Sequence, residues 1–600
     1  MRHKEIVNEI LANRQVSRDD LRVVPVCDMK RAVDMFDGVK AVNRIAKAIE
    51  NKEMIVLFGD YDADGGIGTA IGLRSLKKLT DNVAAVTNNR FIEGFGMKHE
   101  SYEKIKDKYP NVKLIVTVDN GTSIDASLAK RVRMDGVDLI VTDHHEAPEA
   151  ISEVFAIVNP KHPKDRTNTQ YLCGAAVIWK VMMDVHAKLG SNIDVFNEEI
   201  DLVTVATIGD VVPMTRENRT ICKIGMEKLR KTPQPALADI IALTSKSGNI
   251  TEDFIGYNIV PMFNSVSRIE GTIDPVIELL LSENSSNRIT KVMELVGMNR
   301  QRKEISKKQE ELGMLLAKLE CHKDVIIIYS KDFHKGVVGI IAGRVKEAYG
   351  KPTIVLNKLD DGTLKGSARS IAGFDIKVAL DACADNLISY GGHSLSAGVH
   401  LEECNIELLR ESLCKQLKAI KPESLGVVES RADVKVRPAD ITFDLINELK
   451  TLEPYGPGFR RPLIEINGFN VYKHFEMGSG EHLKLTDANN LNVIAFRSAE
   501  AYRELGKPSK LNVIGFPEVN VWNGIESVQF IAKDIGKSYK MDLGRFDYTD
   551  NSFVELDYMR SLVTGEYVAV RRQINAQAIY NSDLVYVCKN MKSGRIELCS

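Results

Sequence analysis

The sequence lacks several features that identify other classes of protein. Its nine cysteines are scattered, odd in number and without a CxxC pair, which argues against a disulfide framework or a zinc ribbon and fits reduced thiols. No stretch reaches the length of a membrane span, and the N-terminus is charged throughout, so neither insertion nor export is indicated. The glycine-rich GxGxxG loop of dinucleotide-binding proteins is also absent. We therefore expect a cytoplasmic protein that does not bind membranes.

The chain also has no excess of positive or negative charge. The net charge is −2, so a site for a polyanion would have to concentrate lysine and arginine locally. The length of 600 residues exceeds what one hydrophobic core serves and predicts three or four domains of about 150 residues.

The periodicity of the sequence changes along the chain. From Met54 to about Met214, short apolar runs alternate with segments of helical period, which predicts an α/β domain with a parallel sheet. A proline-free stretch of helix formers then predicts one long helix, followed by a second, smaller α/β unit and by period-two runs typical of a β-barrel of roughly five strands. The expected segments are a first domain with an N-terminal lead at 1–285, a connecting helix at 286–322, the smaller α/β domain at 323–425, the barrel at 430–540, and a region without a motif at 541–600.

Four clusters of acidic residues each follow an apolar run that is predicted to be a buried strand. They are Asp60, Asp62 and Asp64, then Asp119, then Asp143 with His144 and His145, and finally Asp210. In open α/β sheets, ligands lie beyond the carboxyl ends of the strands, where all four clusters are expected. Burying several like charges there is unfavourable unless cations compensate, so the pattern predicts bound metal.

The donor types indicate which metal. In DYDADGG the carboxylates alternate along a segment expected to be extended before Gly65 and Gly66 turn the chain into a helix. Hard oxygen donors suit Mg²⁺ or Mn²⁺, and a histidine among them favours Mn²⁺. Two such ions about 4 Å apart would suit displacement at a phosphate. Taken singly, each cluster could instead be a solvated turn or ordinary packing, but four clusters at one topological position favour metal.

The motifs resemble those of a known family. GDYDADG, TVDNG, TDHH, NPKHP with LCGAAVIWK, and IGDVVPM with ENR are similar to the DHH phosphoesterase superfamily and, within it, to the RecJ-like single-stranded-DNA exonucleases. FNSVSRIEGTIDPVIELLL resembles the segment that closes the family's catalytic lobe. HKGVVGIIAGRV, LKGSARS and YGGHSLSAG resemble the DHH-associated domain, and LEPYGPGFRRP resembles the entry to an oligonucleotide-binding (OB) barrel. The resemblance covers most of residues 50 to 535. GGIG after the first motif, Gly209 and GFRRP depart from the family pattern.

The resemblance implies two divalent cations, Mn²⁺ by preference or Mg²⁺. Asp60, Asp62 and Asp119 would hold one cation, and Asp64, Asp119, His144 and Asp210 the other. His145, together with Asp143, would be catalytic, with His145 either donating a proton near the scissile phosphate or only orienting other groups.

The second half of the chain would hold the substrate. Arg369 and Ser367 in GSARS, and His393 after Gly391 and Gly392, have the composition of a phosphate site, although either motif alone could be a tight turn. Arg344, and Arg268 of the first domain, are further candidates for holding a phosphate, or else cap their helices. In the barrel, basic and aromatic residues interleave as in a groove for single strands, unless they form a solvated face over core aromatics. These residues are Arg460, Arg461, Lys473, Lys484 and Arg497 with Tyr472, Phe475 and Phe496.

The expected function is therefore a 5′-to-3′ exonuclease on single-stranded DNA, with the polarity implied by the resemblance alone. Its setting would be DNA repair, recombination or replication in a bacterial cytoplasm, or in the host cytoplasm if the source is viral. A single-strand-binding protein or a helicase could be a partner. Two alternatives remain: a phosphodiesterase for short oligonucleotides or cyclic dinucleotides, which generally lacks a barrel, and a replication scaffold without metals, against which the intact acidic motifs argue.

Overall fold

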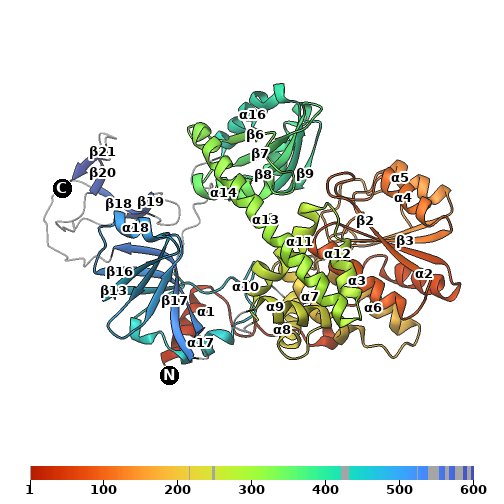
Figure 1. Cartoon of the computed structure of the whole chain (residues 1–600), viewed down its shortest axis with the longest axis horizontal. Coiled ribbons are helices and arrows are strands. Elements are labelled where there is room, and N and C mark those ends of the chain that lie inside the picture. Colours follow the sequence, from red (N-terminus) through yellow and green to blue (C-terminus); the bar gives the residue numbers. More distant parts are fainter. Residues whose placement is uncertain are drawn as a thin grey trace.

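The computed structural model describes residues 2–214, 216–245, 250–420, 432–522 and 525–537, together with the backbone of strands 553–560, 567–573, 586–590 and 596–599. Three lobes are visible in Figure 1, with the long helix α13 running from the first to the second. Among the described helices, none combines the length and the apolar character needed to cross a bilayer.

The first lobe is built on a five-stranded sheet in the order β2-β1-β3-β4-β5, in which every pair is parallel. Helices α4 and α5 cover one face, and α2, α3 and α6 the other, which explains why the strands are almost continuously apolar. The parallel sheet is confirmed. The elements are β1 (Met54–Gly59), β2 (Val83–Thr87), β3 (Val112–Val118), β4 (Asp138–Thr142), β5 (Ala156–Val158), α2 (Gly38–Glu50), α3 (Ala63–Lys77), α4 (His99–Lys108), α5 (Ala126–Met134) and α6 (Gly174–Lys188).

A helical layer completes this lobe. Within it, the prediction that Asp210 follows a strand is wrong. The run that ends at Asp210 is not a strand, because it forms the last turns of helix α7, and Asp210 is its C-cap. A helix buried on all sides shows no amphipathic period, so its β-branched residues resemble a buried strand. The helices are α7 (Val195–Gly209), α8 (Arg216–Lys231), α9 (Pro235–Thr244), α10 (Glu252–Phe254), α11 (Val260–Ile269), α12 (Asp274–Leu281) and the connecting helix α13 (Ser285–Glu320).

The second lobe has a mixed sheet in the order β6-β7-β8-β10-β9. Only β6 and β7 run parallel, and the other neighbours are antiparallel. The elements are β6 (Ile326–Ser330), β7 (Thr353–Lys358), β8 (Leu364–Arg369), β9 (Ser389–His393), β10 (Ser396–Leu401), α14 (Val338–Tyr349), α15 (Ile376–Asp381) and α16 (Ile406–Ala419).

The third lobe has a seven-stranded sheet, in the order β11-β12-β16-β17-β15-β14-β13, instead of roughly five strands. The two strands added to the expected set are β11, which has three residues, and β13, whose KHFEM sequence is largely exposed and does not alternate. The elements are β11 (Val434–Val436), β12 (Ile464–Asn470), β13 (Lys473–Met477), β14 (His482–Thr486), β15 (Asn492–Ala495), β16 (Lys510–Trp522), β17 (Ile525–Lys537), α17 (Phe443–Lys450) and α18 (Ala499–Glu504). A further sheet has the order β19-β18-β20-β21, with the elements β18 (Phe553–Arg560), β19 (Tyr567–Gln573), β20 (Tyr586–Asn590) and β21 (Ile596–Cys599).

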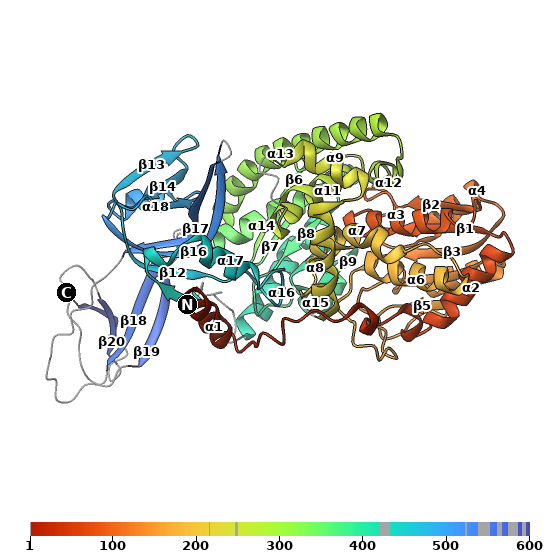
Figure 2. The same ribbon diagram turned by 90° about the horizontal axis from the view of Figure 1, so that it is seen from below.

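The N-terminal helix α1 (Arg2–Asn13) belongs to the third lobe, not to the first as expected for the 1–285 lead. Its apolar face enters the barrel core, with Ile6, Val7 and Ile10 fully buried. Arg14, just after the helix, forms an ion pair of 2.7 Å with Asp433 at the entry to the barrel. Figures 1 and 2 both show α1 beside this lobe, on the side of α17. The first residues of the chain are thus part of the third lobe, which is otherwise formed by residues from 432 onward.

Candidate functional site

Three of the acidic clusters lie at the carboxyl edge of the first sheet, as predicted. Asp60 follows β1, Asp119 follows β3, and Asp143 follows β4. The DYDADGG segment differs from the prediction, since α3 already begins at Ala63 and so before the glycines. Asp62 is the N-cap of this helix and accepts hydrogen bonds from the backbone N–H groups of Asp64 and Gly65.

Asp64 lies in the first turn of α3, where the helix dipole favours negative charge. Its carboxylate accepts hydrogen bonds from the N–H groups of Gly174, at 2.7 Å, and Ala175, at 2.9 Å. These two residues begin α6, so two helix N-termini face one carboxylate. A side chain at position 174 would collide with Asp119, since a Cβ there would lie 2.5 Å from the Asp119 Cβ. This contact explains the glycine of LCGAA.

The fourth cluster reaches the same place from the helical layer. The Asp210 Oδ2 lies 3.5 Å from the His144 Nε2, which is also 3.9 Å from the Asp64 Oδ2 and 3.1 Å from the Asp119 Oδ1. The donor atoms fall into three groups whose members lie within 4.8 Å of one another: Asp60, Asp62 and Asp119; Asp64, His144 and Asp210; and Asp119, His144 and His145. All six residues expected as metal ligands are therefore adjacent.

Buried atoms without partners indicate that these groups fit a cation. Asp60 Oδ1 and Asp119 Oδ1 are both buried and have no hydrogen-bond donor among the described residues. A buried carboxylate oxygen without a donor is unfavourable unless a cation neutralises it. Oxygen donors with one imidazole nitrogen suit Mn²⁺ or Mg²⁺.

The electrostatics lead to the same conclusion. Burial, and then the charge of Asp62, raises the pKa of Asp60 well above its ordinary value and that of Asp64 to about 6. Burial together with the charge of Asp64 likewise raises the pKa values of Asp119 and Asp210. Burial and the neighbouring His145 lower the pKa of His144 to about 3, so its imidazole is neutral and able to bind metal. Divalent cations would relieve the repulsion among these carboxylates.

His145 is held in place by Asp143. The Asp143 carboxylate lies 2.8 Å from the His145 Nδ1 and also accepts hydrogen bonds from the N–H groups of Thr122 and His144. Burial alone would lower the pKa of His145, but the hydrogen bond to Asp143 and its charge outweigh burial and raise the pKa to about 9. Asp143 is itself buried and engaged by protein groups. Its geometry is that of a residue that orients His145.

His145 faces the second lobe. Its ring stacks on that of His393 with a centroid distance of 5.8 Å and an interplanar angle of 15°. His393 ends strand β9, in which Gly391 and Gly392 pair with β10. Phe95 of the first lobe also packs near the site, 4.9 Å from the His145 ring. The GGH motif and the DHH motif therefore meet across the two lobes.

A cluster of arginines occupies the same seam. Arg369 on β8 donates a hydrogen bond of 2.6 Å to the Ser367 hydroxyl, and Arg268 on α11 donates to the Gly336 carbonyl of the second lobe. Burial, and then the charges of Arg90, Arg302 and Arg369, lower the pKa of Arg268 below its ordinary value. Cations that repel one another in a partly buried seam favour binding of an anion such as phosphate.

Two members of this cluster were missed by sequence reasoning, and one expected member makes other contacts. Arg90, which stacks over the Tyr61 ring at 5.0 Å, and Arg302 on α13 are in no recognisable motif. Arg344, expected at the same phosphate, instead pairs with Glu347 at 3.2 Å and with Glu310 at 3.9 Å. Both of these partners are on helices, so Arg344 braces α14 against α13.

The barrel aromatics are exposed and are not part of a core. Tyr472 is 69%, Phe475 65% and Phe496 56% exposed, which fits stacking platforms for bases. Lys473 lies 5.4 Å from the Tyr472 ring. Arg461, in contrast, lies over the Phe516 ring and pairs with Asp253 of the first lobe, so it belongs to the joint between lobes.

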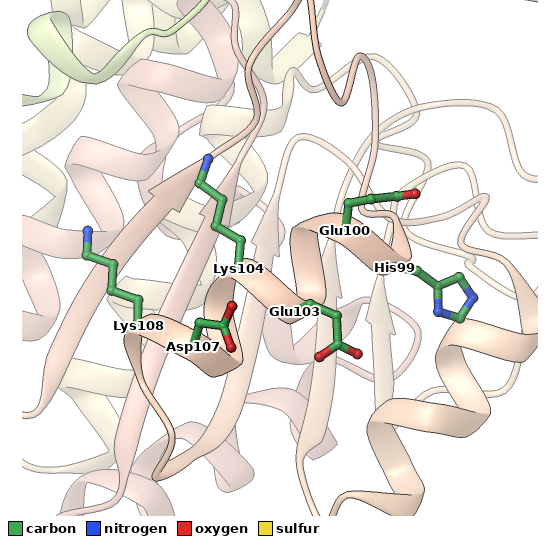
Figure 3. Close-up of a pocket in the computed structure, with 6 residues that line it drawn as sticks. All are labelled: His99, Glu100, Glu103, Lys104, Asp107 and Lys108. Carbon is green, nitrogen blue, oxygen red and sulfur yellow. The ribbon is translucent and has the colours of Figure 1, made fainter.

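A hollow along α4 is unrelated to this site. Figure 3 shows six side chains that line it, all from this one helix, and they are charged or imidazole groups of both signs. They are His99, Glu100, Glu103, Lys104, Asp107 and Lys108. A surface formed by one face of one helix is a solvated face and offers no enclosed site.

Comparisons with known proteins match each lobe separately. Residues 54–207 match the DHH family N-terminal domain, residues 322–419 the DHHA1 domain, and residues 432–534 the RecJ OB domain. The chain is 32% identical over 511 residues to the single-stranded-DNA-specific exonuclease RecJ of Bacillus subtilis (strain 168), covering 84% of this chain and 64% of that protein. It is 29% identical to RecJ of Escherichia coli (strain K12), covering 84% and 87%.

The fold is also that of a solved relative. The crystal structure of RecJ in complex with Mn²⁺ from Thermus thermophilus matches with a TM-score of 0.74 at 24% identity, covering 91% of this chain and 79% of that chain. This chain thus spans less than two thirds of the Bacillus subtilis relative but most of the other two.

Proposed function

This chain belongs to the RecJ-like exonucleases of the DHH family, and on that premise we propose that it hydrolyses single-stranded DNA from the 5′ end, using two divalent cations. The observation that carries the proposal is the convergence of six metal-ligand candidates opposite a seam of clustered arginines. A polyanion can bridge two such surfaces, because its phosphates can bind both the cations and the guanidinium groups.

Each part of the site has a separate task. Asp60, Asp62 and Asp119 would hold one cation and Asp64, His144 and Asp210 the other, with Asp119 beside both. When bound, Mn²⁺ or Mg²⁺ lowers the pKa of water and neutralises the charge that develops on the phosphate. The surrounding residues hold these ligand atoms in place. Burial and the neighbouring His145 lower the pKa of His144, which leaves its imidazole free to bind a cation. Other residues of the chain bind the strand.

His145 provides the proton. In the metal-free protein the pKa of His145 is raised to about 9, and its Nδ1 is held by Asp143, so the other ring nitrogen, Nε2, is the one that would donate. A protonated imidazole at this place can donate to a phosphate oxygen as the leaving group departs. His393, stacked on it, and the arginine cluster would hold the terminal phosphate.

The third lobe favours a polymer over a short substrate. Three exposed aromatic residues beside basic residues form a platform that a cyclic dinucleotide would not need. The oligonucleotide phosphodiesterase is therefore the second choice. A cytoplasmic setting in DNA repair, recombination or replication, with a single-strand-binding protein or a helicase as partner, is part of the same proposal and rests on the family alone.

The deciding experiment compares release of product from 5′-labelled and 3′-labelled single strands in Mn²⁺, with duplex and RNA substrates as controls. The wild type is expected to release labelled mononucleotide early from the 5′-labelled strand and only late from the 3′-labelled strand. Asp119→Ala should abolish release while the fold, monitored by circular dichroism, is retained. Early release from the 3′ label would overturn the polarity. Asp119→Ala activity within about tenfold of wild type, roughly 1.4 kcal/mol of barrier, would overturn the metal site.

A further inference from the structure

The chain is strained immediately after Asp210. Val211 has a φ of +58°, although it is β-branched and such residues rarely adopt the left-handed region. Its side chain is 65% exposed, so packing of that side chain does not enforce the conformation. Strain of this kind persists only where the surrounding structure holds the backbone. The segment from Val211 to Met214 must therefore be fixed by its neighbours.

One restraint is the amide of Asn218, in the first turn of α8. This side chain is 2% exposed, and its Nδ2 donates to the Pro213 carbonyl at 3.0 Å and to the Tyr171 carbonyl at 2.6 Å. Tyr171 lies three residues before Gly174, whose N–H binds the Asp64 carboxylate. A single amide thus ties the segment after one metal-site carboxylate to the segment that positions another.

The second restraint comes from the third lobe. Arg219, next along α8 and 2% exposed, donates to the carbonyls of Pro454 at 2.9 Å and Leu452 at 2.8 Å. It thereby seats residues 452–459, which we term the docking loop, on the first lobe. The docking loop in turn accepts a hydrogen bond of 2.6 Å from the Met214 N–H at its Pro457 carbonyl.

The docking loop is also shaped to admit Met214. A Cβ at Gly456 would lie 3.1 Å from the Met214 Cε and 3.2 Å from its Cβ, so a larger residue would press on the strained segment. Tyr455 N–H is bonded to the Glu252 carboxylate at 2.8 Å, which anchors the loop to α10 as well.

We propose that Asn218, Arg219 and the docking loop are positioning elements that hold the strained segment 211–214 and thereby set Asp210 among the metal-site donors. The inference rests on the proposed metal site and adds to it a dependence on the barrel lobe. The ENR motif (residues 217–219) then has a function. Arg219 binds the docking loop of the third lobe, and Asn218 restrains the segment that follows Asp210.

The test measures Mn²⁺ affinity of the full chain by electron paramagnetic resonance, without DNA. Asn218→Ala is expected to weaken Mn²⁺ binding about tenfold, as loss of a residue behind a metal ligand commonly does. Val211→Asn should restore most of that loss in the double variant, because asparagine adopts the left-handed conformation with less strain and needs less restraint. Asn51→Ala, the same change at an exposed helix C-cap, is the matched control and should leave affinity unchanged.

Gly456→Ala tests the same idea from the barrel side and removes no hydrogen bond. It should weaken Mn²⁺ binding in the same direction, and Val211→Asn should again compensate, so the proposal stays testable if Asn218→Ala does not fold. Full Mn²⁺ affinity in both single variants, or a loss that Val211→Asn does not reduce, would overturn it. The proposed function fails separately, if wild-type protein binds Mn²⁺ but does not degrade single strands.

Discussion

Replacing Asp64 by asparagine is expected to change the pH dependence of stability in the metal-free protein. Burial, and then Asp62, raises the pKa of this carboxyl to about 6 from an ordinary value of 3.8. The folded protein therefore binds the proton more tightly than the unfolded chain does. Stability falls as pH rises between these two values and stays low above pH 6. At neutral pH the charged Asp64 destabilises the metal-free fold by about 3 kcal/mol.

The asparagine variant lacks this charge but also loses part of a hydrogen-bond pair. The introduced amide has one acceptor oxygen for the N–H groups of Gly174 and Ala175, which in the wild type each bind a separate carboxylate oxygen. That loss, about 1–2 kcal/mol, does not depend on pH. The difference in unfolding free energy, variant minus wild type, should therefore rise between pH 5 and pH 7.5, by on the order of 1 kcal/mol.

The assay is urea unfolding in EDTA at these two pH values, repeated in Mn²⁺. Asp81→Asn, at an exposed position, serves as the control and should show no such rise. In Mn²⁺ at a hundred times its dissociation constant, the wild type should gain about 2.7 kcal/mol and the variant much less. A variant whose stability difference in EDTA is independent of pH, or which gains as much from Mn²⁺ as the wild type, would refute the reasoning.

Three further predictions concern the metal, the strand and the fold. Initial rates should be higher in Mn²⁺ than in Mg²⁺ and negligible in Ca²⁺, because His144 adds a nitrogen donor; equal rates in Ca²⁺ and Mn²⁺ would contradict this. Phe475→Ala and Phe496→Ala should each weaken binding of long single strands, measured by fluorescence anisotropy, by about 1–3 kcal/mol and leave turnover of very short ones unchanged. A loss that is equal for both lengths would show that these rings do not hold the strand. Ile10→Ala should lower the unfolding free energy of the third lobe, measured by hydrogen exchange, by about 2–5 kcal/mol without altering Mn²⁺ affinity, whereas an unchanged lobe would mean that α1 contributes nothing to its core.

The acidic residues of the site that follow strands could be located from the sequence because a parallel sheet gathers the ends of its strands at one edge. Asp60, Asp119 and Asp143 needed only that rule. Asp210 was placed at the same edge by the same rule, and that reasoning was wrong because the element before it is a helix; the family resemblance separately implied it as a ligand. A fully buried helix and a buried strand are both continuously apolar, so local pattern does not separate them.

Other features had no local signal. Arg90 lies in a loop whose sequence resembles any solvated turn, and only the packing of the lobes places it in a cluster with three other arginines. The apolar face of α1 could be read from its period, but its partner could not. Amphipathicity shows that a face is buried and says nothing about what covers it. Val211 is similar, since its strain is a property of its surroundings and not of its residue type.

The packing of α1 has a consequence for synthesis of the chain. Asn13 donates a hydrogen bond to the Asp433 carbonyl, a partner 420 residues further along. At translation rates of about 5–20 residues per second, roughly 20 to 80 s pass between the emergence of the two. During that time Ile6, Val7 and Ile10 have no barrel to cover them, and both other lobes can fold first. In the nascent chain these apolar side chains therefore stay uncovered until the residues of the barrel have emerged.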